Sequence, residues 1–431
     1  MNNLQEIQEK VNYDKIFDCV QCGYCLPVCP TYETMEVETH SPRGRINLVK
    51  MVAEGKAAIE DLKDPIEKCL GCMACTTVCP TDVQYGMIFE GAKQVIEEHH
   101  VKSAAQKKVE EFVFDSLFPS AKWMGTLGNA TWLYQKSGLQ KLVQTTHLTA
   151  LTLHLSRFER VLPDLPSPFE RAFRKRRVLP DYKLRKTVAF FTGCVMDGVF
   201  FKTNKNTVEL LRLAGAEVLM PKEQTCCGAL HSHSGKGESA KELAMRNIEA
   251  FDLEDVDYIV NNAGGCGAKM KEYPQLFEQG TVWHERAREF ADKVRDISEV
   301  LVELDGLTFT NPIRRIISYQ PSCHMTNVQR VCEEPRILLN SIPGIQIKEL
   351  ERPDFCCGSA GIYNLVNYDE SMEILDLKMI DVKDRRPDAV VTTNPGCLLQ
   401  MKLGIERHGL QEQIEALHLV DLLIEAGPVP K

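Results

Sequence analysis

Eight cysteines near the start of the chain fall into two copies of one spacing. Residues 19–30 read CVQCGYCLPVCP and residues 69–80 read CLGCMACTTVCP. In the pattern C-x2-C-x2-C-x3-C-P, three closely spaced thiolates bind one cuboidal cluster and the fourth cysteine binds the neighbouring cluster. The spacing therefore predicts two [4Fe-4S] clusters. The expected ligands are Cys19, Cys22, Cys25 and Cys79 for the first cluster, and Cys69, Cys72, Cys75 and Cys29 for the second.

Zinc is the alternative for these cysteines, because C-x2-C pairs also build zinc ribbons. A zinc site uses four ligands and gives the exchanged fourth cysteine no role, so iron-sulfur chemistry is favoured. Pro30 and Pro80 follow the fourth cysteines and fix the chain direction there. Between the two runs, Arg43 and Arg45 either donate hydrogen bonds to cluster sulfur or a partner carboxylate, or are solvated and pair with local acids.

A second set of cysteines lies in an internal repeat that relates residues 186–270 to residues 315–401. The segments KTVAFFTGC, AEVLMPKEQTCCG and DYIVNNAGGCG correspond to RRIISYQPSC, IQIKELERPDFCCGSAG and DAVVTTNPGC. We call the two copies CCG modules, after their Cys-Cys-Gly sequence. The matched cysteines are Cys194 with Cys323, Cys226 and Cys227 with Cys356 and Cys357, and Cys266 with Cys397.

Four converging thiolates favour a soft metal centre. An adjacent cysteine pair suits a single tetrahedral ion poorly because neighbouring side chains diverge, but it can reach two metal atoms of one cluster, and Gly228 and Gly358 permit a close turn after each pair. We expect one or two further iron-sulfur clusters here, with zinc as the alternative. Cys332, which has no counterpart, is expected to be a buried structural cysteine. The histidines near these cysteines are left out of the ligand set: His231, His233 and His324.

Short apolar runs precede the cysteines of each module, and amphipathic segments such as residues 206–215, 238–251 and 370–384 separate them. Alternating strands and helices predict a parallel sheet, with the cysteines at its carboxyl edge. The fold class is α+β and α/β: a helical ferredoxin-like N-terminal domain with two [4Fe-4S] clusters, then a duplicated Rossmann-like parallel α/β CCG domain. The expected domains are residues 1–100, a helical connector and linker at 101–180, and the modules at 181–305 and 306–431.

Residues 100–180 contain no cysteine and predict amphipathic helices broken at Pro119, Gly128 and Gly138. A proline-rich stretch with the basic run Arg174 to Arg177 follows, expected as a solvated linker, with weak contact to anionic lipid as the alternative. The apolar side chains of this region are expected to close the chain's own core rather than to form a face that docks on a partner protein or lies on a membrane surface. They are Phe114, Leu117, Phe118, Trp123 and Trp132.

Composition excludes several classes of protein. The 431 residues are 44% hydrophobic and 26% charged, as in a soluble globular protein. A net charge of −9 argues against a nucleic-acid partner. The chain shows neither a signal peptide nor an apolar run of membrane-spanning length, so we expect it in the cytoplasm, where its 17 cysteines indicate metal or redox chemistry rather than disulfides.

The two cysteine runs, together with SPRGRINLVK, GGCGAKMKEY and CCGSAGIYNL, resemble the iron-sulfur subunits of glycolate oxidase from about residue 15 to about residue 425. The resemblance implies an electron-transfer subunit with no catalytic residue of its own. It would take electrons from an FAD-binding 2-hydroxy-acid dehydrogenase subunit and pass them toward quinone or another acceptor. FAD would belong to the partner, and peripheral contact with the inner face of the membrane would fit a quinone acceptor.

Two other functions stay open. Related modules of heterodisulfide reductases end in C-x2-C, whereas Cys266 is followed by GAK and Cys397 by LLQ, which puts disulfide reduction in doubt. A heterodisulfide-reductase-like subunit with catalytic CCG clusters is nevertheless the alternative function. A zinc-stabilised scaffold in residues 181–431 is the third hypothesis.

Overall fold

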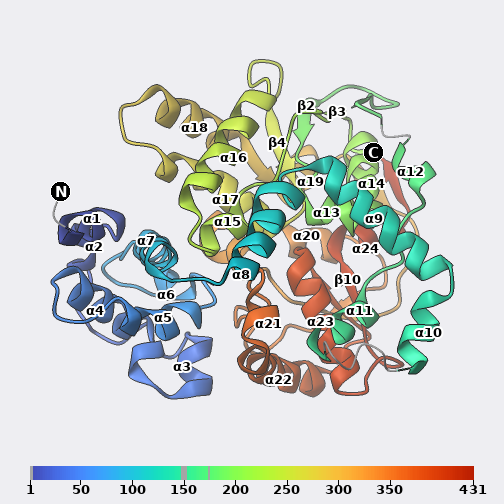
Figure 1. Cartoon of the computed structure of the whole chain (residues 1–431). Helices are drawn as coiled ribbons and strands as arrows, with labels where there is room; N and C mark the ends of the chain where they lie inside the picture. Colours follow the sequence, from blue (N-terminus) through green and yellow to red (C-terminus); the bar gives the residue numbers. More distant parts are fainter. Residues whose placement is uncertain (1–2, 147–152, 173–174) are drawn as a thin grey trace.

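The computed structural model describes residues 3–146, 153–172 and 175–431 (Figure 1). Residues 3–100, here called the front domain, fold into short helices around a core that includes Ile46, Val49 and Ile88. Ser41 caps one of these helices by accepting a hydrogen bond from the Gly44 N–H, and Pro42 occupies its first turn. The helices are α1 (Asn3–Lys10), α2 (Tyr13–Ile16), α3 (Pro30–Met35), η1 (Glu38–His40), α4 (Pro42–Ala53), α5 (Glu60–Glu67), α6 (Ala74–Thr77) and α7 (Tyr85–His99).

The connector runs from the front domain across the face of the two modules (Figure 1). It consists of α8 (Ala104–Glu110), η2 (Glu111–Leu117), α9 (Ala121–Lys136), α10 (Leu139–Thr146), α11 (Leu153–Val161) and α12 (Pro168–Ala172). The predicted breaks at Pro119 and Gly138 are confirmed, but the break at Gly128 is wrong. The helix α9 continues through Gly128 because the missing side chain makes room for Arg171, whose Nη2 would lie 2.7 Å from a Cβ there.

The expected solvated linker is partly wrong as well. Arg177 and Val178 form the edge strand β1, which pairs antiparallel with β3 of the first module. The Arg177 guanidinium also pairs with the buried carboxylate of Glu217 in β3. Arg174, the first residue of the basic run, lies outside the described residues, whereas Lys175 and Arg176 are exposed.

The first module is a parallel sheet with the strand order β1-β3-β2-β4-β5, to which only β1 adds an antiparallel edge. Strands predicted from the sequence are present, and β5 is an addition that its short length concealed. The elements are β2 (Lys186–Phe190), α13 (Val195–Gly198), α14 (Phe201–Leu213), β3 (Ala216–Leu219), α15 (Ala229–His233), α16 (Gly237–Ala250), β4 (Tyr258–Asn261), α17 (Gly264–Lys271), η4 (Tyr273–Leu276), α18 (Val282–Lys293), β5 (Val294–Asp296) and α19 (Ile297–Leu304).

The second module repeats this order as β8-β7-β9-β10, again with parallel pairs. The strand expected in IQIKEL is shorter than predicted and spans only Gln346–Ile347. The elements are β6 (Leu307–Phe309), β7 (Ile316–Tyr319), η5 (Met325–Gln329), α20 (Glu334–Asn340), β8 (Gln346–Ile347), α21 (Tyr363–Val366), α22 (Tyr368–Arg385), β9 (Ala389–Thr392), α23 (Pro395–Arg407), β10 (Glu415–His418), α24 (Leu419–Glu425) and β11 (Pro428–Pro430).

The two modules share one apolar core, in which Phe190 of β2 and Tyr319 of β7 belong to the same buried cluster. The helix α14 contacts α24, and α19 contacts α20, so helices of both modules fill the space between the sheets. The strand β11 pairs antiparallel with β6 and ties the end of the second module to its beginning. In the part of the chain that the structure describes, no helix combines the length and apolar character needed to cross a membrane.

Candidate iron-sulfur centres

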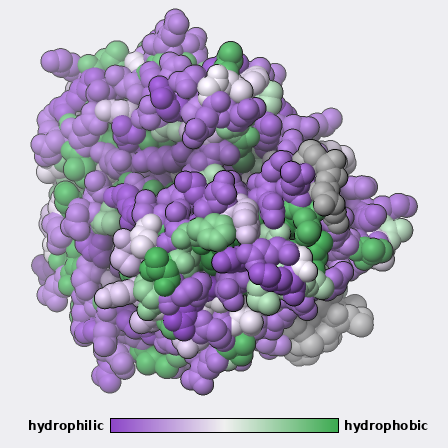
Figure 2. All heavy atoms as spheres, turned by 90° about the vertical axis from the view of Figure 1, so that its left-hand side faces the viewer, coloured by the Kyte–Doolittle hydropathy of each residue, from purple (hydrophilic) through white to green (hydrophobic). Residues whose placement is uncertain are grey.

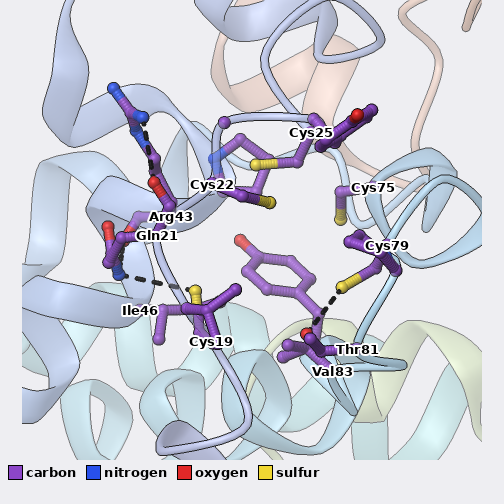
Figure 3. A pocket seen from close by; sticks show the side chains of 16 residues that line it. Cys19, Gln21, Cys22, Cys25, Arg43, Ile46, Cys75, Cys79, Thr81 and Val83 are labelled. Carbon is purple, nitrogen blue, oxygen red and sulfur yellow. Dashed lines mark hydrogen bonds between the residues drawn. The ribbon is translucent and has the colours of Figure 1, made fainter.

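The first hollow of the front domain lies under the loop of the first cysteine run. Its lining includes Cys19, Cys22 and Cys25 from that run and Cys79 from the second run, with their sulfur atoms directed toward a common space (Figure 3). Burial raises the pKa of the Cys19 and Cys25 thiols. Burial opposes ionisation of Cys79 too, but the Thr81 hydroxyl and nearby backbone N–H groups bring the pKa of Cys79 below its usual value.

The second hollow is lined by Cys69, Cys72 and Cys75 of the second run together with Cys29 of the first. Cys75 also lines the first hollow, so the two spaces adjoin. Burial raises the pKa of the Cys72 and Cys75 thiols well above the usual value. No carboxylate lines either hollow among the residues described there, so the donor set is sulfur, which fits an iron-sulfur cluster in each.

The two arginines between the cysteine runs have different surroundings. Arg43 pairs with Glu38, with Nε 2.7 Å from Oε1, as the local alternative predicts. Arg45 is 1% exposed and lines the second hollow, so a solvated Arg45 is wrong. Its guanidinium donates to Thr31 Oγ1 and to the Pro65 carbonyl, and it interacts with the Cys29 thiol, which places a buried positive charge beside that hollow.

Replacing Arg45 with methionine is expected to weaken the front domain. The substitution leaves the buried Pro65 carbonyl and Thr31 hydroxyl without their charged donor, at a cost of about 1–3 kcal/mol. The temperature at which the holoprotein loses its visible cluster absorbance should fall by several degrees. Arg43→Met is the matched control, because it removes interactions at the protein surface, the ion pair with Glu38 and a 3.3 Å hydrogen bond to the Gln21 carbonyl, and should change that temperature little. Equal effects of the two substitutions would contradict this account of Arg45.

The first CCG module brings its four cysteines together beyond the carboxyl ends of β2, β3 and β4. Cys194 Sγ lies 3.5 Å from Cys226 Sγ, and Cys227 interacts with both Cys226 and Cys266. The pKa of Cys227 lies well below its usual value, because the thiols of Cys226 and Cys266 donate hydrogen bonds to it. The expectation that the adjacent side chains diverge is wrong, because the thiols of Cys226 and Cys227 contact each other.

The second module repeats the arrangement. Cys323 contacts Cys356, which contacts Cys357, and Cys357 in turn contacts Cys397. In both modules these contacts join the four sulfur atoms into one set. Within the described ranges, no group of three or more His, Cys, Asp or Glu side chains is arranged to hold a single metal ion. An all-sulfur donor set fits an iron-sulfur cluster.

The second hollow of the front domain lies directly against the second module. Leu70 and Cys72 pack with Phe355 and Cys356 in one apolar cluster, to which Cys323 also contributes. Asn327 Nδ2 donates to the Cys72 carbonyl at 2.8 Å, and its Oδ1 accepts a hydrogen bond from Thr77 at 2.9 Å. No local sequence pattern predicts this junction, although Asn327 follows Cys323 by four residues.

The remaining polar candidates stay outside the sulfur sets. Cys332 is half-buried rather than buried and precedes α20, where its carbonyl accepts a hydrogen bond from Arg336. His231 is buried and hydrogen-bonds the Phe114 carbonyl through Nε2. The rings of His233 and His324 lie 5.4 Å apart, close to the Glu90–Lys269 ion pair that joins the front domain to the first module.

The apolar side chains of the connector differ in how deeply they are buried. Phe114 is buried and its ring contacts those of Phe118 and His231, which confirms a role in the chain's own core. Leu117 and Trp132 are half-buried. Trp123 is 49% exposed and contacts Phe112, so it does not close the core.

Comparisons with known proteins match three regions of the chain: the front domain, the connector and the two CCG modules. Residues 15–83 match a 4Fe-4S dicluster domain, and residues 188–271 and 317–402 each match a cysteine-rich domain. Residues 105–162 match the linker region of the glycolate oxidase iron-sulfur subunit. The chain thus combines a dicluster domain with a duplicated cysteine-rich domain in a mixed helical and α/β architecture.

Relatives extend the likeness along the whole chain. The chain is 47% identical to the probable glycolate oxidase iron-sulfur subunit of Bacillus subtilis, over 98% of this chain and 96% of that protein. It is 28% identical to the glycolate oxidase iron-sulfur subunit of Escherichia coli, over 88% of each. It is also 34% identical to lactate utilization protein A of Oceanobacillus iheyensis, over 55% of this chain and 96% of that protein. The chain therefore belongs to the family of glycolate oxidase iron-sulfur subunits.

Proposed function

We propose that this chain is the electron-transfer subunit of a glycolate or lactate oxidising complex. It receives electrons from an FAD-bearing dehydrogenase subunit and passes them toward quinone or another acceptor. The observation that carries the proposal is the junction at Cys72, where the sulfur set of the front domain adjoins Cys323 and Cys356 of the second module. Iron-sulfur clusters at these positions would supply one-electron redox chemistry, and the polypeptide would hold them close together.

The proposed ligands are the sixteen cysteines other than Cys332. In the front domain, a helical ferredoxin-like unit within residues 1–100, the cysteines divide between the two hollows with the fourth cysteine of each run exchanged. In the Rossmann-like modules at 181–305 and 306–431, each set of four would hold a further cluster. The parallel order that both sheets share supports this division.

An apolar patch around the first hollow supports a docking site for the dehydrogenase subunit. Phe17, Val20 and Tyr24 are 53%, 62% and 68% exposed, and the last two line the opening of that hollow beside the exposed Cys22. Figure 2 shows apolar side chains set among hydrophilic ones on the face that carries the front domain. Exposed apolar side chains beside a redox centre are more favourably buried against a protein partner than left in contact with solvent.

The exposed Lys175 and Arg176 support a weaker contact, with anionic lipid on the cytoplasmic side of the membrane. Two cations give only reversible attachment. Such a contact would bring the chain near a quinone acceptor.

The direct test uses the full chain purified without oxygen. Alone, it should show the spectroscopic signals of reduced clusters after addition of dithionite but no reduction by glycolate or lactate. Addition of the FAD-binding subunit should make its clusters reducible by one of these acids. Turnover of a 2-hydroxy acid by the chain alone would contradict the proposal, and so would cleavage of a disulfide substrate, which would support the heterodisulfide-reductase-like alternative.

Replacing Asn327 with leucine is expected to slow electron exchange between the front domain and the modules. The change removes both the 2.8 Å bond to the Cys72 carbonyl and the bond to Thr77. Because these bonds hold the Cys72 loop against the second module, their loss should lower the rate of exchange, measured by rapid-freeze spectroscopy after reduction of the front clusters. Thr77→Val, which spares the bond to Cys72, should slow exchange less. Unchanged exchange in the Asn327 variant would remove this junction from the route.

A further inference from the structure

A single asparagine connects the cysteine sets of the two modules. Asn394, the residue before α23, accepts a hydrogen bond from the Gly265 N–H at 3.1 Å through Oδ1. Its Nδ2 lies 3.6 Å from Cys397 Sγ and donates to it. Because Oδ1 faces a backbone N–H, which can only donate, the orientation of the amide is fixed and Nδ2 must point toward the sulfur.

A second donor serves the same module. His324 Nδ1 lies 3.6 Å from Cys323 Sγ. A cysteinate that ligates metal carries no proton and can only accept, so the ring nitrogen would be the donor in the loaded protein. Two of the four cysteines of the second module thus have a polar side chain directed at their sulfur.

The first module has neither donor. In the repeat, DYIVNNAGGC aligns with DAVVTTNPGC, so that Ala263 occupies the place of Asn394, and Val195 follows Cys194 where His324 follows Cys323. Alanine and valine side chains cannot donate. Buried positive charge does not distinguish the modules, because Lys269 interacts with Cys227 in the first and Lys378 with Cys357 in the second. The modules therefore differ in their hydrogen bonds to sulfur.

We infer that the centre of the second CCG module has the higher reduction potential of the two, with Asn394 and His324 as its positioning residues. The inference rests on the proposed function in one respect, that each module holds a cluster. Hydrogen bonds to cluster sulfur stabilise the reduced state, which carries more negative charge, and so raise the potential. An electron shared between the modules therefore resides in the second, which is also the module that contacts Cys72.

The test is a redox titration of the anaerobically purified full chain, followed by electron paramagnetic resonance. Cys227→Ser and Cys357→Ser variants identify the signals of the first and second modules. In the parent protein the signal of the second module should appear first as the potential is lowered. In Asn394→Ala the midpoint potential of the second module should fall by about 59 mV, which corresponds to a tenfold change in the one-electron equilibrium constant. The midpoint potential of the first module should not change.

Further variants separate tuning of the potential from structural support. Asn394→Asp keeps an oxygen for the Gly265 N–H but loses the donor to Cys397, so its midpoint should fall at least as far as in Asn394→Ala. Ala263→Asn should raise the midpoint of the first module. Asn364→Ala is the control, because that buried amide donates to Gln400 Oε1 at 2.9 Å and not to sulfur.

The outcomes are distinguishable from failure of the proposed function. The inference would be overturned if the clusters of the two CCG modules had equal potentials, or if the midpoint potential in Asn394→Asp were that of the parent protein. Neither result would contradict electron transfer by the chain. A single cluster shared by the two CCG modules would overturn it too, and quantitation of iron and sulfide detects this. Absence of sulfide from the CCG modules would instead reject the proposed cofactor.

Discussion

Replacement of Cys357 with serine is expected to remove the cluster of the second module and to spare the two front clusters. Cys357 is 2% exposed, and its thiol contacts those of Cys356 and Cys397, so it sits in the middle of its sulfur set. A serine hydroxyl is a hard ligand that replaces thiolate poorly for iron. The variant should lose the iron and sulfide of one cluster, and acceptor reduction by the complex should fall roughly 100-fold or more.

The control for this experiment is Cys332→Ser. Cys332 is half-buried and lies outside all four sulfur sets, so its replacement should leave iron, sulfide and acceptor reduction unchanged. If Cys357→Ser retained the iron content of the parent protein, the second module would not hold a cluster through this cysteine. Zinc in place of iron in the parent protein would support the scaffold hypothesis for residues 181–431.

Serine substitutions of the two fourth cysteines are expected to affect opposite clusters. Cys79 is the fourth cysteine of the second run but lines the hollow of the first, and Cys29 is the fourth cysteine of the first run but lines the hollow of the second. Cys79→Ser should therefore destabilise the cluster held by the first run, and Cys29→Ser the cluster held by the second. Each variant should lose one of the two front signals and about the same amount of iron.

The second hollow provides the means to tell the two signals apart. Cys72 lies close to Cys323 and Cys356, so the second front cluster should couple magnetically to the centre of the second module. Cys29→Ser should abolish that coupled signal, whereas Cys79→Ser should preserve it. If each substitution instead removed the cluster of its own run, the exchanged arrangement of ligands would be wrong.

Local spacing was enough to predict most of the sulfur chemistry. The eight front cysteines are specific because a C-x2-C-x2-C loop can direct three thiolates to one space whatever surrounds it. The repeat likewise predicted which cysteines of the modules correspond, and apolar runs such as residues 258–261 predicted the strands that precede them. These features depend on residues close together in the chain, where backbone geometry limits the possible arrangements.

Contacts between distant residues were decided only by the tertiary structure. Asn327 meets Cys72, and Asn394 meets Gly265, because the front domain and both modules pack together; no local pattern encodes such a meeting. The same reason accounts for the buried Arg45 and for Gly128, whose missing side chain leaves room for Arg171. The sequence by itself determined that sixteen of the cysteines fall into four sets of four, a grouping that predicts metal binding. Packing of separate elements decided which sets adjoin and which sulfur atoms receive hydrogen bonds, since both depend on burial and on distances that spacing along the chain does not contain.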